Sequence, residues 1–168
     1  ILMVDINGEK LKMILQEKSS KEMLEYNNLR ESAIIELDES LIWKLRTKNW
    51  GKGSFLQNIF PKVNNRNWMK RNKTNQIIGL EGSNLLSKAI LESWNKGGLH
   101  NNIAFSDHIL SNSNDEAKKI LSRFRAHLIA SGSKHGLLNH NRKFYYDPIR
   151  KSLLPIYYDG DSKINNIE

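Results

Sequence analysis

The sequence contains no cysteine, only three prolines and no long uninterrupted apolar run. The absence of cysteine excludes disulfide scaffolds, thiolate zinc sites and cysteine nucleophiles. A membrane-spanning helix needs ~20 consecutive apolar residues, so we expect none in this chain. The five histidines are scattered and do not have the spacing of zinc ligands. With 168 residues, the chain has the length of one domain or of a piece of one.

Acidic residues are missing from one long stretch. Between Lys44 and Leu80 there are nine basic residues and no acidic residue, whereas the rest of the chain has 17 basic and 18 acidic residues. The net charge of +8 therefore comes from one segment, which also carries aromatic residues: Trp43 at its edge, then Trp50, Phe55, Phe60 and Trp68. Basic residues interleaved with aromatic ones are typical of single-stranded nucleic acid binding. The alternative is a solvated insertion whose aromatic side chains pack onto the domain.

The first half of the chain predicts a hairpin followed by a helix. Apolar residues from Ile1 to Ile6 precede Asn7-Gly8, and Leu11, Met13 and Leu15 alternate after it. Asn-Gly between strands is the strongest short-range signal for a β-hairpin, here over residues 1–17. Ser19 followed by Glu22 is a capping-box pattern, and it predicts a helix that runs to about Leu29. Further predictions are a strand over residues 32–37, a short helix over 39–45 and mostly irregular structure in the basic segment.

The second half predicts two helices and a second hairpin. Ser83 can cap a helix that buries Leu86, Ile90 and Trp94 and is stopped by Gly97-Gly98. Ser113 with Glu116 opens another helix, with Ile120, Leu121, Phe124 and Leu128 on one face and Gly132 at its end. The aromatic or β-branched runs 142–147 and 153–158, joined through Asp147-Pro148, predict a hairpin. We see no repeat and no domain boundary, so the expected fold class is α+β in a single domain.

Chemistry is expected at the open end of the second hairpin. Asn141 precedes its first strand and Asp159 follows its second strand, so both should lie at the same end. An amide oxygen and a carboxylate there can reach one cation, and Mg²⁺ prefers such hard oxygen ligands. Protein kinases use this order: a loop with His and a final Asn, a short hairpin, then an Asp on the metal. His135, Asn141 and Asp159 repeat it, although Asn and Asp are also common turn residues.

Two regions of the chain resemble the CotH family, atypical protein kinases named after a spore-coat protein. One is the first hairpin, from Val4-Asp-Ile-Asn-Gly-Glu to Leu15-Gln-Glu-Lys18; the other comprises Asn141-Arg-Lys-Phe-Tyr-Tyr-Asp and Pro155-Ile-Tyr-Tyr-Asp-Gly-Asp161. The resemblance implies ATP bound between two lobes, magnesium, and phosphate transfer to a protein hydroxyl. It assigns Asn141 and Asp159 to the metal. It places Gln16 and Glu17 in the segment that links the lobes, where backbone groups meet adenine.

The chain also departs from this pattern. A kinase-like catalytic loop has an Asp about two residues after its His, but Leu137 occupies that position. His135, His140 and Asp161 are the candidates to replace it, because a general base needs only reach and a suitable pKa. A Gly-rich phosphate loop and an ion-paired Lys are absent, and both belong upstream of Ile1; either the fragment lost them or this protein never had them. We therefore expect a fragment of a CotH-like kinase domain: 1–43 as the end of the small lobe, 44–80 as a basic insertion, and 81–168 as the metal-binding half of the large lobe.

Three functions remain open from the sequence. The first is a phosphotransferase that uses ATP and magnesium, with the basic segment giving positive potential near the nucleotide or an acidic protein substrate. The second is a catalytically inactive interaction module that keeps the fold, as Leu137 suggests. The third is nucleic acid binding through residues 44–80. The structural alternatives for single residues are a helix-end contact for His135, an ordinary turn for Asp159 to Asp161, and a solvated side chain for Glu17.

Overall fold

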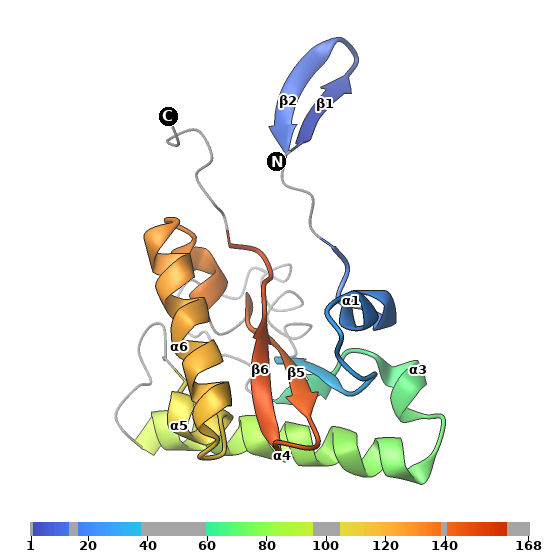
Figure 1. The fold of residues 1–168 in the computed structure, drawn as a ribbon, viewed down its shortest axis with the longest axis vertical. Coiled ribbons are helices and arrows are strands. Elements are labelled where there is room, and N and C mark those ends of the chain that lie inside the picture. The colour runs from blue at the N-terminus through green and yellow to red at the C-terminus, as the bar shows by residue number, and fades with distance from the viewer. Residues whose placement is uncertain (1, 14–16, 38–59, 96–104, 139–140, 161–168) are drawn as a thin grey trace, which may run out of the picture. The chain divides into compact units, whose positions relative to one another are not determined.

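The computed structural model describes residues 2–13, 17–37, 60–95, 105–138 and 141–160. The chain divides into two compact units, Ile1–Glu31 and Ser32–Glu168, and each is described by itself. The described residues form two antiparallel sheets and five α-helices (Figure 1), which confirms the predicted α+β class. The short helix predicted over residues 39–45 and its neighbours up to 59 lie outside the described residues, as does Gly97-Gly98.

The first unit begins with the predicted hairpin, formed by β1 (Leu2–Ile6) and β2 (Glu9–Met13). Asn7 and Gly8 both have positive φ, 57° and 88°, as a two-residue turn between twisted strands requires. The Gly8 N–H donates to the Asp5 carboxylate at 2.9 Å. The register places five apolar residues on one face of the hairpin: Leu2, Val4, Ile6, Leu11 and Met13.

Helix α1 (Lys21–Tyr26) is shorter than predicted at both ends. Its N-cap is Ser20 rather than Ser19, and the Ser20 hydroxyl donates to the Glu22 carboxylate instead of accepting from the backbone. The helix ends early because Asn28 takes a left-handed conformation with a φ of 54°. The N–H groups of Asn28 and Leu29 then return to the last carbonyls of the helix, which closes it as a Schellman motif.

The second unit is built on a four-stranded antiparallel sheet in the order β4-β3-β5-β6. Its strands are β3 (Ile34–Leu37), β4 (Pro61–Val63), β5 (Lys143–Asp147) and β6 (Ser152–Ile156). β5 and β6 are the predicted second hairpin, and β3 falls in the predicted strand over 32–37. One face of the sheet carries apolar core residues, namely Val63, Ile35, Leu37, Phe144, Tyr146 and Leu153.

Helices α3 (Arg66–Met69) and α4 (Lys73–Asn95) correct the prediction for the end of the basic segment. Residues 61–80 are not irregular: they form an edge strand, a single helical turn and the start of the longest helix. α4 begins ten residues before Ser83, because the Asn72 side chain accepts from the Asn75 N–H at its first turn. Among the described residues, no helix combines the length and the apolar character that a bilayer span requires.

Gly82 lets α4 lie directly on the sheet, where the helix contacts all four strands. A Cβ built on Gly82 would clash with Ile35 and with the base of the Tyr146 ring, so only glycine fits this helix–strand approach. The Tyr146 hydroxyl donates to the Glu81 carboxylate at 3.1 Å. Burial, reinforced by this carboxylate, raises the pKa of Tyr146 to about 12.

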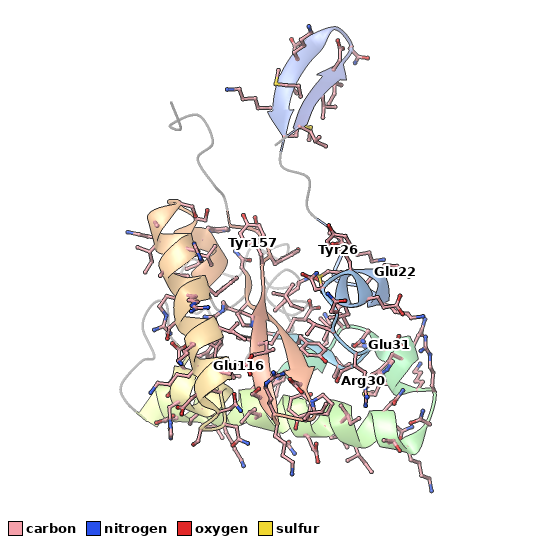
Figure 2. The ribbon with its side chains drawn as sticks, in the orientation of Figure 1. Glu22, Tyr26, Arg30, Glu31, Glu116 and Tyr157 are labelled. Atoms are coloured by element: carbon pink, nitrogen blue, oxygen red, sulfur yellow. The ribbon has the colours of Figure 1, made fainter. Side chains whose placement is uncertain are left out.

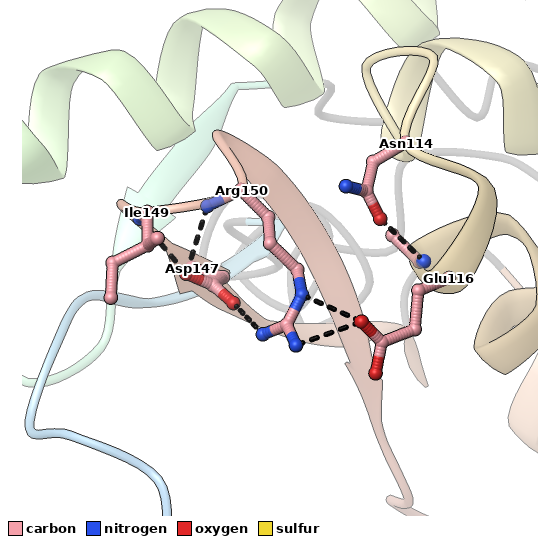
Figure 3. Close-up of polar contacts among 6 residues, drawn as sticks. Asn114, Glu116, Asp147, Ile149 and Arg150 are labelled. Atoms are coloured by element: carbon pink, nitrogen blue, oxygen red, sulfur yellow. Dashed lines mark hydrogen bonds and ion pairs between the residues drawn. The ribbon is translucent and has the colours of Figure 1, made fainter.

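Helices α5 (Asp107–Leu110) and α6 (Asp115–Ala130) complete the second unit, and α6 lies beside β6 (Figure 1). The N-cap of α6 is Asn114 rather than the predicted Ser113, and its side chain accepts from the Ala117 N–H at 2.9 Å. Leu121 and Leu128 are buried, in agreement with the predicted apolar face. Gly132 ends the helix as predicted, with a φ of 69°. Figure 3 shows how Arg150, in the turn between β5 and β6, joins Asp147 to Glu116 at the start of α6.

Candidate functional site

A short run of turns carries the chain from the end of α6 to the first strand of the second hairpin. It contains a 3₁₀ helix, η1 (Lys134–Leu137), which holds His135. The Leu138 N–H donates to the His135 carbonyl, and the Asn141 N–H donates to the Leu138 carbonyl at 2.9 Å. This sequence of turns delivers Asn141 to the start of β5 in a fixed orientation.

Asn141 ties the two ends of the hairpin together. Its side chain is buried, and its amide nitrogen donates to the His135 carbonyl at 3.2 Å and to the Asp159 carbonyl at 3.5 Å. The first carbonyl lies in the loop before β5 and the second follows β6. The structure thus brings Asn141 beside Asp159, the proximity on which the predicted metal site depends.

His135 meets Asp159 at the same place. The Nε2 atom of His135 lies 3.6 Å from a carboxylate oxygen of Asp159, which is ion-pair distance when the imidazole is protonated. Both side chains are accessible, with exposed fractions of 40% and 53%. Asp159 has a φ of 44°, a conformation that non-glycine residues adopt infrequently. We refer to His135, Asn141 and Asp159 as the hairpin-end cluster.

Two glycines allow the loop and the segment after β6 to approach this closely. A Cβ on Gly136 would lie 3.3 Å from the Gly160 Cα and 3.3 Å from the Tyr158 carbonyl oxygen. A Cβ on Gly160 would clash with the ring of Tyr157. The backbones of residues 134–137 and 158–160 are therefore packed against each other, and this contact holds the hairpin-end cluster in place. Figure 2 shows Tyr157 at the end of β6.

The cluster offers two oxygen atoms of the kind that magnesium prefers. The amide nitrogen of Asn141 is used in hydrogen bonds, whereas no hydrogen bond to its side-chain oxygen is found in the part of the chain that the structure describes. That oxygen and the exposed Asp159 carboxylate are hard ligands, and Mg²⁺ commonly takes one or two carboxylates and completes its shell with phosphates and water. No group of three or more His, Asp or Glu side chains that could hold a metal occurs among the described residues, so a metal would need ligands from a bound molecule or solvent.

No protein-family model, curated protein or solved structure matches this chain. The resemblance to the CotH family therefore stays a prediction that rests on the sequence.

The structure does not place the remaining predicted site residues relative to this cluster. Gln16, His140 and Asp161 lie outside the described residues. Glu17 is exposed and belongs to the first unit. Leu137 is partly buried in η1, two residues after His135, where a kinase-like loop would have its Asp.

Sequence reasoning missed a row of charges across the sheet next to the cluster. Glu36 on β3 contacts Lys62 on β4 and Lys143 on β5, each at 3.2 Å. The Lys143 ammonium also lies 3.7 Å from the centre of the Tyr158 ring, which is a cation–π contact one residue before Asp159. This row follows once β3 is known to pair with both β4 and β5, because the register places Glu36 opposite both lysines.

Sequence reasoning also missed Arg142, which immediately follows Asn141. Its guanidinium is almost fully buried and lies over the rings of Phe144, Phe105 and Phe124 at 4.9, 5.5 and 5.9 Å. Within the described residues its Nε has no hydrogen-bond partner. Burial, together with repulsion from Arg125, lowers the pKa of Arg142 to about 10. The side chain is a cation held mainly by aromatic rings.

The described part of the basic segment gives little support to base stacking. Trp68 is buried in the core, and Lys62 is paired with Glu36. Phe60 is 70% exposed. The other aromatic residues considered for stacking, Trp43, Trp50 and Phe55, lie outside the described residues, so nucleic acid binding stays a prediction for that part of the chain.

Proposed function

We propose that this chain is part of a CotH-like atypical kinase that transfers phosphate from ATP, with magnesium, to a protein hydroxyl. The observation that supports the proposal most is the contact between the loop before β5 and the segment after β6 through Asn141. It gathers an imidazole, an amide oxygen and a carboxylate at one end of a hairpin. The sequence order of these groups is the order that kinases use.

In this proposal each residue of the cluster has one role. The Asp159 carboxylate and the Asn141 side-chain oxygen would hold a magnesium ion, which would supply positive charge to the phosphoryl group being transferred. His135 takes the proton of the attacking hydroxyl, because Leu137 has no group that can.

Thermal unfolding of the 168-residue chain tests the metal and nucleotide site. ATP with magnesium should raise the unfolding temperature, since a ligand at about 100 times its Kd adds about 2.7 kcal/mol to stability. Asp159→Asn should abolish the part of the shift that depends on magnesium. The matched control is Asp115→Asn, which neutralises an exposed carboxylate on α6. No magnesium-dependent shift in the wild type, or an equal loss in both variants, would refute the site.

A second candidate is an inactive module that binds a partner and keeps the kinase-like fold. The specific observation in its favour is Leu137 at the position of the catalytic Asp. Transfer of the γ-phosphate to casein, or autophosphorylation, distinguishes the two candidates. Nucleotide-dependent stabilisation without phosphate transfer would favour the inactive module, whereas transfer that is lost in His135→Ala would favour the enzyme.

A further inference from the structure

The junction of α3 and α4 carries a concentration of positive charge. Arg66, Lys70, Arg71 and Lys73 are all exposed and lie within eight residues. We call residues 66–80 the α3–α4 elbow. The sequence has no acidic residue anywhere between Lys44 and Leu80. In the described part of the chain, no ion pair to Arg66, Lys70 or Lys73 is found.

The backbone of the elbow is firmly anchored. The Asn65 side chain accepts from the Ile34 N–H at 2.9 Å and donates to the Ser32 carbonyl at 2.8 Å, which fixes the start of α3 to β3. Trp68 is buried in the core, and the Asn75 side chain donates to its carbonyl at 2.8 Å. A surface that is already ordered loses little backbone entropy on binding, so its charges are well placed to recognise a partner.

Apolar side chains continue the basic surface along α4. Ile77 and Leu80 are 56% and 61% exposed. They follow Lys73 by four and seven positions, which places all three on one face of the helix. The elbow therefore offers cations and, within two helical turns, two large apolar groups. A partner that complements it must present carboxylates or phosphates together with apolar side chains.

We propose that the α3–α4 elbow is a docking surface for an acidic, partly apolar segment of a protein. The phosphate backbone of a duplex would satisfy the charges but would leave Ile77 and Leu80 without a complement. Single-stranded nucleic acid needs exposed aromatic rings for stacking, and Trp68 of the elbow is buried. That the docked protein is the phosphate acceptor rests on the proposed function; the docking itself needs no phosphate transfer.

The test measures fluorescence anisotropy of a labelled synthetic peptide of alternating glutamate and leucine, with the 168-residue chain and no nucleotide. The double variant Lys70→Glu/Lys73→Glu should weaken binding by about tenfold or more. Ile77→Ser/Leu80→Ser should also weaken it, by several-fold. The matched control is Lys118→Glu/Lys119→Glu, which makes the same change of net charge at two exposed positions of α6 and should change Kd by less than about twofold.

Several outcomes would overturn the proposal. They are no binding of the peptide, an equal loss in the elbow and α6 charge variants, or no effect of the Ile77 and Leu80 substitutions. Tighter binding of duplex DNA or of phosphatidylserine vesicles, with the same dependence on Lys70 and Lys73, would assign the surface to those partners instead. Failure of the magnesium–ATP test with intact peptide binding would refute the proposed function alone, and the reverse result would refute the docking surface alone.

Discussion

At the residue scale, the buried side chain of Arg142 carries a positive charge that its packing against the aromatic rings does not need. A buried ion is stabilising only when a partner offsets the loss of its hydration, and the described residues offer Arg142 rings but no hydrogen bond to Nε. The aliphatic stem and the three rings account for its position in the core. Its charge should therefore contribute little to stability.

Arg142→Met and Arg142→Ala separate the shape of this side chain from its charge. Met keeps most of the contacts with the rings, so we expect the free energy of unfolding to stay constant or to rise, by up to about 4 kcal/mol. Ala removes those contacts and should lower it by about 2 kcal/mol or more. Urea unfolding monitored by circular dichroism measures both. A loss with Met as large as with Ala would show that the charge itself has a partner.

Asp147 makes stability depend on pH. Burial alone would raise its pKa, but the Arg150 guanidinium at 2.7 Å and the N–H groups of Ile149 and Arg150 hold the pKa below the ordinary value of 3.8 (Figure 3). A carboxyl whose pKa is lower in the folded state contributes its stability above the unfolded pKa and loses it as pH falls through the folded pKa.

Asp147→Asn should therefore lower the unfolding free energy at pH 7, by about 1–3 kcal/mol as expected for a buried hydrogen-bonded charge. The variant should also lose part of the decline in stability below about pH 4. Urea midpoints of both proteins between pH 7 and pH 2 give the comparison. A constant difference between the two curves over this range would contradict the assignment.

At the element scale, two glycines of α4 face neighbours that differ in how easily they can move. A Cβ on Gly82 would meet the rigid base of the Tyr146 ring at 2.8 Å, whereas a Cβ on Gly79 would meet the sulfur of Met69, the far end of a flexible side chain, at 3.0 Å. Alanine in a helix interior is favoured over glycine by about 1 kcal/mol. The gain is the same at both positions, but the steric cost is not.

We therefore expect opposite results from two matched substitutions. Gly82→Ala should destabilise the protein by about 1–3 kcal/mol, because overpacking exceeds the gain in helix propensity. Gly79→Ala should be neutral or stabilising by up to about 1 kcal/mol, because Met69 can move aside. Thermal unfolding followed at the helical signal decides between them. Equal effects of the two substitutions would mean that contact with the sheet does not control the helix.

The same elements show what could be predicted from the sequence. Hairpins were found because a two-residue turn and alternating apolar residues are local signals, and the proximity of Asn141 to Asp159 follows from hairpin geometry. The start of α4 was missed because the basic segment has weak apolar periodicity, and the sheet that this part of the helix contacts is not a local signal. The charge row on Glu36 was missed for a related reason: it needs the pairing of strands that are distant in sequence.

At the scale of the whole molecule, the main hydrophobic cluster lies in the second unit. Among the described residues, the members of this cluster lie between Ala33 and Leu153, whereas the first unit has one buried apolar side chain, Leu24 of α1. The rest of the first unit is mainly a two-stranded hairpin, and an isolated hairpin of this kind is at best marginally stable in water. Cooperative unfolding of the chain should therefore be determined by residues 32–168.

A chain that begins at Ser32 tests this division. It should unfold in one cooperative transition, within about 4 °C of the full chain, which corresponds to a loss of about 1 kcal/mol or less. Leu86→Ala, a substitution in the core, should destabilise both chains by the same amount, about 2–5 kcal/mol, because additive effects are expected of independent regions. A broad transition of the shortened chain, or a Leu86→Ala effect that differs between the two chains by more than about 0.5 kcal/mol, would show that the units stabilise each other.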